Sequence, residues 1–480
     1  MSIIVALDLG TTGNRAIAFD SNGQIICRHY QEFTQIYPQP AWVEHDPMEI
    51  WRSVQTVLGQ TIAQVGRENI AAIGITNQRE TTVVWDRNTG HPVYNAIVWQ
   101  CRRTADRCIQ LSDHREKIQA KTGLVLDAYF SATKIEWILN HLPPGTDRQA
   151  LKFGTIDTWI LDRLTGGNVH ATDPSNASRT MLWNIHTRDY DTELLDLFHV
   201  PKSMLPEVLP SNSRFGVTAD TGIPITGILG DQQASLFGQA GWESGVVKNT
   251  YGTGLFAMTI CPDSTSITPN ILTTVAWQID NDITFAKEGS VFIGGSLIQW
   301  LRDGLGIIQH SKDVEALALE SGTADGVVIV PAFVGLGAPH WDANARGLII
   351  GITRGTSKSN IAYAALEAIA FQSRDIIQVL TDTHFPPQQL RVDGGACQNN
   401  LLMQLQANIL GMPVERPAVT DTTAVGVAMM AGLGAQIWTL AMLPQIREVD
   451  RIFVPGHHLG TPLTRWNDAA NRSKGWAKSL

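Results

Sequence analysis

The chain has 480 residues, more than the ~250–300 at which a single hydrophobic core stops growing, so two or more domains are expected. Hydrophobic residues make up 44% of it and charged residues 17%, a composition that excludes a disordered protein. The formal net charge of −9 argues against nucleic acid or an anionic membrane surface as a partner. Any anionic ligand must therefore be held by local groups and not by a basic surface.

The cysteines and the start of the chain indicate a cytoplasmic protein. The five cysteines are scattered and form no CxxC pair, so free thiols are expected and not disulfides or a zinc site. The first residues carry no basic charge before Asp8, unlike a signal peptide. Residues 422–446 are uncharged and long enough to span a bilayer, but glycine, proline and polar residues interrupt them. We expect a small-residue helix packed inside a soluble domain, with no membrane insertion.

In the first half, apolar strand-like runs alternate with a helical pattern. The motif Asp20-Ser21-Asn22-Gly23 predicts a hairpin turn, and the spacing of apolar residues over 48–65 predicts a helix. Strands are expected over 3–7, 16–19, 24–29, 70–76, 82–85 and 92–99. This alternation favours a mixed α/β fold.

The same order restarts after about residue 225. Strands are expected over 224–229, 246–247, 291–293 and 390–392, and helices over 296–302, 360–381 and 400–410. Several of these strands end in glycine or aspartate followed by a polar turn, as the first strand does. We therefore expect two domains of similar construction, residues 1–245 and 246–480, with a cleft between them.

Three glycine-rich turns follow predicted strands: Asp8-Leu9-Gly10-Thr11-Thr12, Tyr251-Gly252-Thr253-Gly254 and Asp393-Gly394-Gly395. Glycine lets the backbone approach a phosphate, and hydroxyls and amides donate to its oxygens without net charge. One such turn usually only reverses the chain, but three in this order point to a nucleotide. The chain has no Gly-Lys dipeptide, which excludes a P-loop, and no strand-linked GxGxxG, which weakens a Rossmann site.

The three turns resemble the phosphate-1, phosphate-2 and adenosine motifs of the actin-like ATPase superfamily. Within it, the chain resembles the FGGY family of carbohydrate kinases, and its glycerol kinases most closely, over about residues 3–440. Further segments that carry the resemblance are 74–82, 99–104, 176–181, 230–234, 248–254 and 335–339. The resemblance implies an α/β fold of two actin-like (ribonuclease H-like) domains flanking a catalytic cleft, assembled as a homodimer or homotetramer.

The resemblance also implies an activity, the ATP-dependent phosphorylation of glycerol to sn-glycerol 3-phosphate. Asp231 matches the general base that takes the proton from the attacking hydroxyl, while a carboxylate capping the following helix is the alternative. The implied substrate-binding residues are Arg79, Glu80, Trp99, Tyr129, Asp231, Gln232 and Phe256.

Two of these assignments depend on local structure. On a strand, the adjacent Arg79 and Glu80 would point to opposite faces, so both reach the ligand only if the strand ends before them. The alternative for this pair is a surface ion pair. Trp99 and Phe256 would wall the carbon backbone of the substrate, and the alternative for each is an ordinary core position.

ATP and Mg²⁺ are the implied nucleotide and metal. The positions that match nucleotide contacts are Thr11, Thr12, Gly13, Arg15, Thr253, Gly295, Gln299, Gly395 and Asn399. Asp8 matches the carboxylate that holds Mg²⁺. The contact is expected to run through water, because magnesium keeps part of its water shell.

Two departures from the family pattern carry predictions. Leu9, Gly13 and Asn14 replace a glutamine and two serines, and the hydroxyl lost at Gly13 predicts a weaker nucleotide contact. Members inhibited by fructose 1,6-bisphosphate carry a basic Gly-Gly-Lys-Gly-Gly-Thr-Arg loop, whereas residues 218–223 contain no basic residue. We therefore expect insensitivity to that effector.

Two other functions stay open at this point. A kinase for a neighbouring polyol, such as erythritol, needs only a modestly longer pocket. A non-catalytic actin-like nucleotide switch or filament protein would use the same turns, although it has no use for a polyol site.

Overall fold

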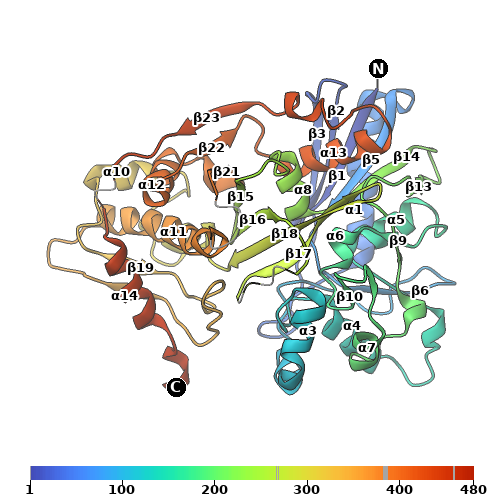
Figure 1. The fold of residues 1–480 in the computed structure, drawn as a ribbon, viewed down its shortest axis with the longest axis horizontal. Helices are drawn as coiled ribbons and strands as arrows, with labels where there is room; N and C mark the ends of the chain where they lie inside the picture. Colours follow the sequence, from blue (N-terminus) through green and yellow to red (C-terminus); the bar gives the residue numbers. More distant parts are fainter. Residues whose placement is uncertain (1, 266–267, 269, 382–386, 458–459, 480) are drawn as a thin grey trace.

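The computed structural model describes residues 2–265, 268, 270–381, 387–457 and 460–479. Its two large sheets lie on opposite sides of the molecule, the earlier half of the chain forming one side and most of the later half the other (Figure 1). The mixed α/β architecture predicted from the sequence is confirmed. Over the described ranges, no helix is long and apolar enough to cross a membrane.

The first sheet has six strands in the order β13-β14-β5-β1-β2-β3. They are β1 (Ile3–Leu9), β2 (Gly13–Phe19), β3 (Ile25–Glu32), β5 (Ile70–Asn77), β13 (Gly216–Val217) and β14 (Pro224–Gly230). The three central strands β1, β5 and β14 are parallel, so their carboxyl ends meet at one edge. The predicted hairpin turn joins β2 to β3, and helix α1 (Pro47–Val65), capped by Asp46, packs on both strands.

Smaller elements lie between these strands in the chain, and many of them share a further apolar core with residues of the second sheet, whereas residues 156–164 pack into the core of the first sheet. The smaller elements are β4 (Glu44–His45), β6 (Val83–Asp86), β7 (Ala96–Ile97), β8 (Leu151–Gly154), β9 (Ala171–Thr172), β10 (Trp183–Asn184), β11 (Asp189–Tyr190), β12 (Glu207–Val208), α2 (Ala105–Gln110), α3 (Arg115–Thr122), α4 (Ser131–Asn140), α5 (Ile156–Leu164), α6 (Pro174–Ala177) and α7 (Thr192–Leu197). The strand predicted over 92–99 is shorter than expected, since β7 pairs there with β4 and Pro92 forms only an isolated bridge to Trp85.

The second sheet has seven strands in the order β17-β18-β16-β15-β21-β22-β23. They are β15 (Val246–Tyr251), β16 (Leu255–Cys261), β17 (Leu272–Ile279), β18 (Asp282–Val291), β21 (Gln389–Asp393), β22 (Val414–Pro417) and β23 (Val449–Phe453). The strand expected over 291–293 is wrong in its bounds, because β18 ends at Val291 and the chain then turns into a helix. Around this sheet lie α9 (Gly295–Asp303), α10 (Asp313–Ser321), α11 (Lys358–Thr381), α12 (Asn400–Leu410) and the pair β19 (Val328–Val330) and β20 (Leu348–Ile350).

Two helices join the sheets. Helix α8 (Asp231–Gly238) follows β14 directly, and α13 (Thr422–Gly434) packs against α8 and against β14, β5 and β1 (Figure 1). A Cβ atom added at Gly426 would collide with the carbonyl oxygen of Ala234, so the two helices approach closely because of this glycine. The uncharged stretch that starts at Thr422 therefore forms a buried small-residue helix, as predicted.

The last elements extend the second half. β23 is an edge strand, and α14 (Leu463–Ser473) buries Trp466 with its ring stacked on Phe371 at 5.2 Å. The five cysteines are buried free thiols, as expected. The domain boundary at 245/246 falls between α8 and β15 but stays a prediction, since α13 from the later half packs on the first sheet.

Candidate active site

The candidate site lies where β1, β5 and β14 end. In parallel sheets, ligands bind outside the carboxyl ends of the strands. Gly10 follows β1, Gln78 to Glu80 follow β5, and Asp231 follows β14. The backbone amide of Gln78 donates to the carbonyl of Leu9 at 2.7 Å, and its side-chain amide donates to the carbonyl of Gly10 at 3.0 Å. These bonds fix the loop after β5 against the first glycine-rich turn.

Arg79 and Glu80 lie in that loop and not on a strand. β5 ends at Asn77, and Glu80 adopts a left-handed backbone with φ of 61°. A non-glycine residue in this region costs roughly 1–2 kcal/mol, so the rest of the site must hold it there. The turn allows both side chains to reach the same polar cluster, which meets the condition set by the sequence. The alternative of a surface ion pair is wrong, because Arg79 is 2% exposed and Glu80 1%.

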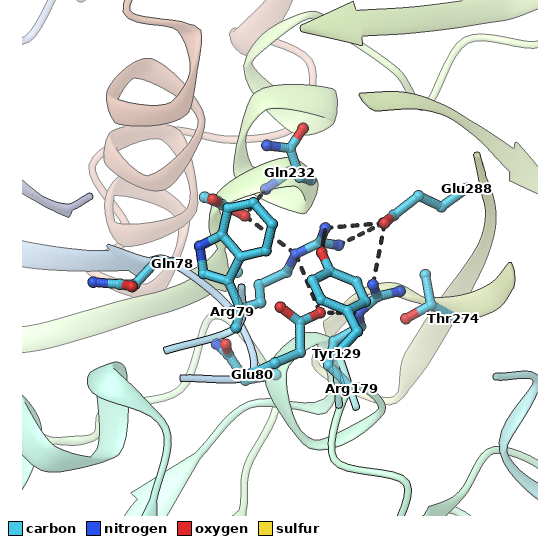
Figure 2. Close-up of polar contacts among 12 residues, drawn as sticks. Gln78, Arg79, Glu80, Tyr129, Arg179, Gln232, Thr274 and Glu288 are labelled. Atoms are coloured by element: carbon cyan, nitrogen blue, oxygen red, sulfur yellow. Dashed lines mark hydrogen bonds and ion pairs between the residues drawn. The ribbon is translucent and has the colours of Figure 1, made fainter. Parts of the chain in front are cut away.

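The guanidinium of Arg79 is surrounded by acceptors (Figure 2). Its Nε lies 3.2 Å from Oδ1 of Asp231. Its Nη1 and Nη2 donate to the two carboxylate oxygens of Glu288 at 2.5 and 3.0 Å, and Nη1 also donates to Gln233 at 3.1 Å. Arg79 therefore joins the candidate base to a carboxylate of the second sheet.

Glu80 is held by a second buried arginine. Nε of Arg179 donates to Oε1 of Glu80 at 2.6 Å, and its Nη2 donates to Oε1 of Glu288 at 3.1 Å (Figure 2). Burial raises the pKa of Glu80, against the pull of Arg179 and Arg79. Burial also raises the pKa of Glu288, but the two arginines outweigh it and bring that pKa down to about 2. Glu288 is therefore the fixed anion of the cluster.

Asp231 is the first residue of α8, with 31% of its side chain exposed. Loss of water around it raises the pKa of its carboxyl, while Arg79 and Lys248 lower it. Its Oδ1 accepts from the backbone amide of Gln232 at 2.7 Å, as a helix-starting carboxylate does. The helix-start geometry and the role of a base are thus compatible, because the carboxylate remains open to a ligand.

Gln232 is oriented by a buried lysine. Nζ of Lys248, on β15, donates to Oε1 of Gln232. An ammonium group can only donate, so the amide oxygen must face Lys248 and the NH₂ group is turned away from it. Burial lowers the pKa of Lys248 to about 8, although Asp393 and Asp231 raise it.

Three aromatic rings from separate segments meet beside this cluster. Trp99 makes edge contacts with Tyr129 at 5.6 Å and with Phe256 at 6.2 Å between ring centroids. Phe256 lies on β16 of the second sheet, so the wall is built from both halves of the chain. Nη2 of Arg79 lies 3.5 Å from the hydroxyl of Tyr129. The predicted substrate-binding residues are therefore brought together, with Arg79 linking the ring wall to the polar cluster.

The first glycine-rich turn adjoins the same wall. Indole Nε1 of Trp99 donates to Oγ1 of Thr11 at 3.0 Å, which leaves the Thr11 hydroxyl proton free for an acceptor. Thr12 beside it is exposed. Asp8 is 7% exposed and pairs with Nη1 of Arg15 at 3.1 Å. Burial raises the pKa of Asp8, and Arg15 opposes this.

The structure leaves no space for a side chain at Gly13, the position where the sequence suggested a missing serine hydroxyl. A Cβ atom at this position would lie 2.7 Å from the carbonyl oxygen of Gln31 and equally close to the ring of Tyr30. Tyr30 in turn lies under the guanidinium of Arg15, with 5.3 Å to the ring centroid. The space that a serine would occupy in the family pattern is filled here.

The turns of the second sheet form a compact group. The amide of Gly295 donates to the carbonyl of Gly252 at 2.8 Å, and the amide of Gly294 to that of Thr253 at 2.7 Å. Gly394 packs on the backbone of Tyr251, where a Cβ atom would lie 2.6 Å from the carbonyl oxygen. The predicted nucleotide residues exposed here are Thr253, Gln299 and Gly395.

Asn399 has a local role as well. Its side-chain oxygen accepts from the amide of Leu402 at 2.8 Å and caps α12. Its NH₂ group and the second lone pair of its oxygen remain for the predicted nucleotide contact.

Residues 218–223, the stretch expected not to bind fructose 1,6-bisphosphate, form a turn that is closed by hydrogen bonds. Thr218 and Ile223 pair through their backbones, and Nε of Arg67 donates to the carbonyl of Thr221 at 2.5 Å. Arg67, a basic residue from another part of the chain, therefore contacts this turn. Insensitivity to fructose 1,6-bisphosphate stays a prediction.

Three site residues were missed from the sequence: Arg179, Lys248 and Glu288. Arg179 and Lys248 lie in segments that carry the family resemblance, but no role could be assigned to them. Glu288 lies in β18, which is buried from Phe285 to Val291. A signal for it exists, because an acidic residue inside a buried strand requires a cationic partner.

Comparisons with known proteins agree with this geometry. The family model of the N-terminal domain of FGGY carbohydrate kinases matches residues 3–238, and that of the C-terminal domain matches residues 247–435. Glycerol kinase 2 of Thermotoga maritima is 52% identical, with 100% of both chains covered, and the glycerol kinase of Burkholderia pseudomallei is 51% identical, with 99% of this chain and 98% of that protein covered.

Solved structures show the same fold. The Plasmodium falciparum glycerol kinase with ADP is 34% identical and superimposes with a TM-score of 0.90, over 98% of each chain. A xylulose kinase from Lactobacillus acidophilus is 22% identical and matches with a TM-score of 0.87, over 100% of this chain and 98% of that chain. The two-domain actin-like fold implied by the sequence motifs is confirmed. The chain belongs to the FGGY family of carbohydrate kinases.

Proposed function

We propose that this protein is an ATP-dependent kinase that converts glycerol to sn-glycerol 3-phosphate. The observation that carries the proposal is the polar cluster of the buried Arg79 and Glu80 with the partly exposed Asp231, beside the ring wall of Trp99, Tyr129 and Phe256. A small triol needs both donors and acceptors for its hydroxyls and an apolar wall for its carbons. Relatives 51–52% identical over nearly the whole chain are glycerol kinases, which supports the same substrate.

The chemistry assigned to the chain is proton transfer and positioning. Asp231 takes the proton from the hydroxyl that attacks the terminal phosphoryl group. Arg79, Glu80 and Gln232 orient the other hydroxyls, so that the reacting oxygen stays close to Asp231. The amides of the glycine-rich turns donate to the phosphates, where charge develops during transfer. The Plasmodium relative was solved with ADP, which supports an adenine nucleotide as a ligand of this chain.

Mg²⁺ fits the first turn through Asp8. Magnesium is commonly held by one or two carboxylates together with substrate phosphates and water. Asp8 supplies one carboxylate at the end of β1, with the hydroxyls of Thr11 and Thr12 close by in sequence. The described residues contain no group of three or more His, Cys, Asp or Glu that would form an all-protein metal cage. When bound, the metal neutralises charge on the nucleotide phosphates.

A non-catalytic nucleotide switch would explain the glycine-rich turns but not the buried charged side chains beside them. Burying Arg79, Glu80, Arg179 and Glu288 costs desolvation energy that a structural role does not require, since an apolar core of similar volume is often as stable. A kinase uses the charges of Arg79 and Glu80 to bind hydroxyl groups. The neighbouring-polyol alternative differs only in pocket length and is separated by substrate preference.

Replacing the base tests the proposal directly. Asp231→Asn keeps the shape and removes the proton acceptor, so the glycerol-dependent rate should fall about 10²- to 10⁴-fold. Nucleotide affinity, measured by calorimetry with ADP, should change little because the proposal assigns Asp231 to the attacking hydroxyl and not to the nucleotide. A rate within threefold of wild type would contradict the role of Asp231. Glycerol-independent ADP release by the wild-type protein would contradict the kinase itself.

A further inference from the structure

Glu288 lies at the junction of the two halves of the molecule. It belongs to β18 of the second sheet and is fully buried. Its ion-pair partners, Arg79 and Arg179, both come from the first half of the chain (Figure 2). The sequence motifs assign Glu288 no role, and the mechanism above does not use it.

Glu288 determines which edge of the Arg79 guanidinium faces the ligand. An arginine presents donors along two edges, one formed by Nη1 and Nη2 and one that includes Nε. Glu288 accepts from Nη1 and Nη2 with separate oxygens, at 2.5 and 3.0 Å. The Nε edge then faces Asp231, with 3.2 Å between Nε and Oδ1.

The same carboxylate keeps two like charges apart. Oε1 of Glu288 accepts from Nη2 of Arg179 at 3.1 Å, and Nε of Arg179 holds Glu80. Charges therefore alternate in the order Glu80, Arg179, Glu288, Arg79, Asp231. Without the central anion, two buried guanidinium groups would face each other, and each would turn toward Glu80 or Asp231.

We propose that Glu288 is the positioning residue for polyol binding, which holds Arg79 and Arg179 so that Arg79 Nε and the Glu80 carboxylate meet the hydroxyls. This inference rests on the proposed function, since it assigns the supporting residue of the same polyol site. The polyol site is then complete only when β18 of the second sheet lies against the loop after β5. Nucleotide contacts at the glycine-rich turns do not depend on this carboxylate.

The test compares three variants of the full-length protein. Glu288→Gln removes the charge with little change in volume, and Glu288→Asp keeps the charge on a shorter side chain. The control is Glu44→Gln, because Glu44 and Arg103 form another buried ion pair at 2.6 Å, with side chains 3% and 0% exposed, and the mechanism above does not use it. For each variant, kcat and the KM values for glycerol and for ATP are measured, together with the melting temperature.

Glu288→Gln should raise the KM for glycerol about ten- to hundredfold, as expected for a lost charged hydrogen bond, while the KM for ATP changes less than about twofold. Glu288→Asp should recover part of the glycerol affinity. Glu44→Gln should lower the melting temperature and leave both KM values near wild type. If Glu288→Gln does not fold, the Glu288→Asp variant still decides the matter through its glycerol KM.

An unchanged glycerol KM in Glu288→Gln, or in Glu288→Asp if Glu288→Gln does not fold, with only the melting temperature lowered, would overturn the inference. So would equal increases in the glycerol and ATP KM values. In those cases an active wild-type protein leaves the proposed function standing. A wild-type protein without glycerol-dependent ADP release would overturn both.

Discussion

Asp231 combines two demands that are usually in conflict. It lies beside the guanidinium of Arg79, which stabilises its charged form, and it is recessed from water, which stabilises its neutral form. Burial is the larger influence, so the pKa of its carboxyl is raised above the ordinary value of 3.8. A base with a raised pKa accepts a proton more readily, at the cost of losing activity in mild acid.

The pH dependence of catalysis follows from this shift. Because Asp231 must be deprotonated to act, kcat/KM for glycerol should fall as pH drops through its raised pKa, and the acid limb should lie above about pH 4. The measurement is kcat/KM at saturating ATP across the acid range, with circular dichroism at each pH to confirm folding. A folded protein with constant kcat/KM down to about pH 4 would contradict the assignment.

Gly13 leads to a prediction opposite to the one drawn from the sequence. The missing serine hydroxyl suggests that Gly13→Ser would improve ATP binding, but the added Cβ would meet Tyr30 and the Gln31 carbonyl at 2.7 Å. Overpacking of this kind typically costs about 1–3 kcal/mol. We expect Gly13→Ser to lower the melting temperature and raise the KM for ATP. Adding Tyr30→Ala to the Gly13→Ser variant should restore only part of the lost stability and ATP affinity, because the Gln31 carbonyl remains. A lower ATP KM in Gly13→Ser alone would contradict this prediction, since it would show that the turn can accommodate a side chain.

At the scale of elements, the crossing of α8 and α13 holds the two sheets together. Gly426 of α13 packs on the carbonyl of Ala234, and Gly238 of α8 packs on the carbonyl of Thr422. This reciprocal contact explains why the helix that starts at Thr422 is rich in small residues.

Gly426→Ala should therefore destabilise the protein by about 1–3 kcal/mol, since the backbone cannot yield without separating the helices. The matched control is Gly59→Ala in α1, where an added Cβ has no neighbour within 4 Å among the described residues. There the better helix propensity of alanine should stabilise the protein by about 0.5–1 kcal/mol. Urea unfolding of both variants measures the difference, and equal effects of the two substitutions would show that the crossing is not tight.

The elements also show what the sequence could and could not provide. Strands β1, β5, β14 and β21 and helices α1, α11 and α12 were predictable, because apolar periodicity and glycine-rich turns are local signals. For Glu80, the sequence indicated only that the strand must end before it; its left-handed backbone conformation was not predicted. The ion pair of Arg79 with Glu288 joins residues 209 positions apart, and no local pattern encodes such a contact.

At the scale of the whole molecule, an acidic chain builds a site for a still more acidic ligand. The net charge of −9 gives no general attraction for ATP. In the proposed site, amide groups of the turns of both sheets, the Thr11 hydroxyl and Arg15 take the place of a basic patch. The polyol site is likewise shared, since Phe256 and Glu288 from the second sheet complete the residues contributed by the first. The homodimer or homotetramer implied by the family resemblance stays a prediction.

The most direct test of the account is a panel of polyols assayed by ADP release. Glycerol, erythritol and diols that lack one hydroxyl group are compared at equal ATP, with a reaction without polyol as the baseline. We predict the highest kcat/KM for glycerol, a loss of about 10²-fold or more for diols because buried polar groups are left unpaired, and almost no release without polyol. Equal ADP release with and without polyol, or a clear preference for erythritol, would contradict the central claim that the cluster around Arg79, Glu80 and Asp231 is a glycerol site.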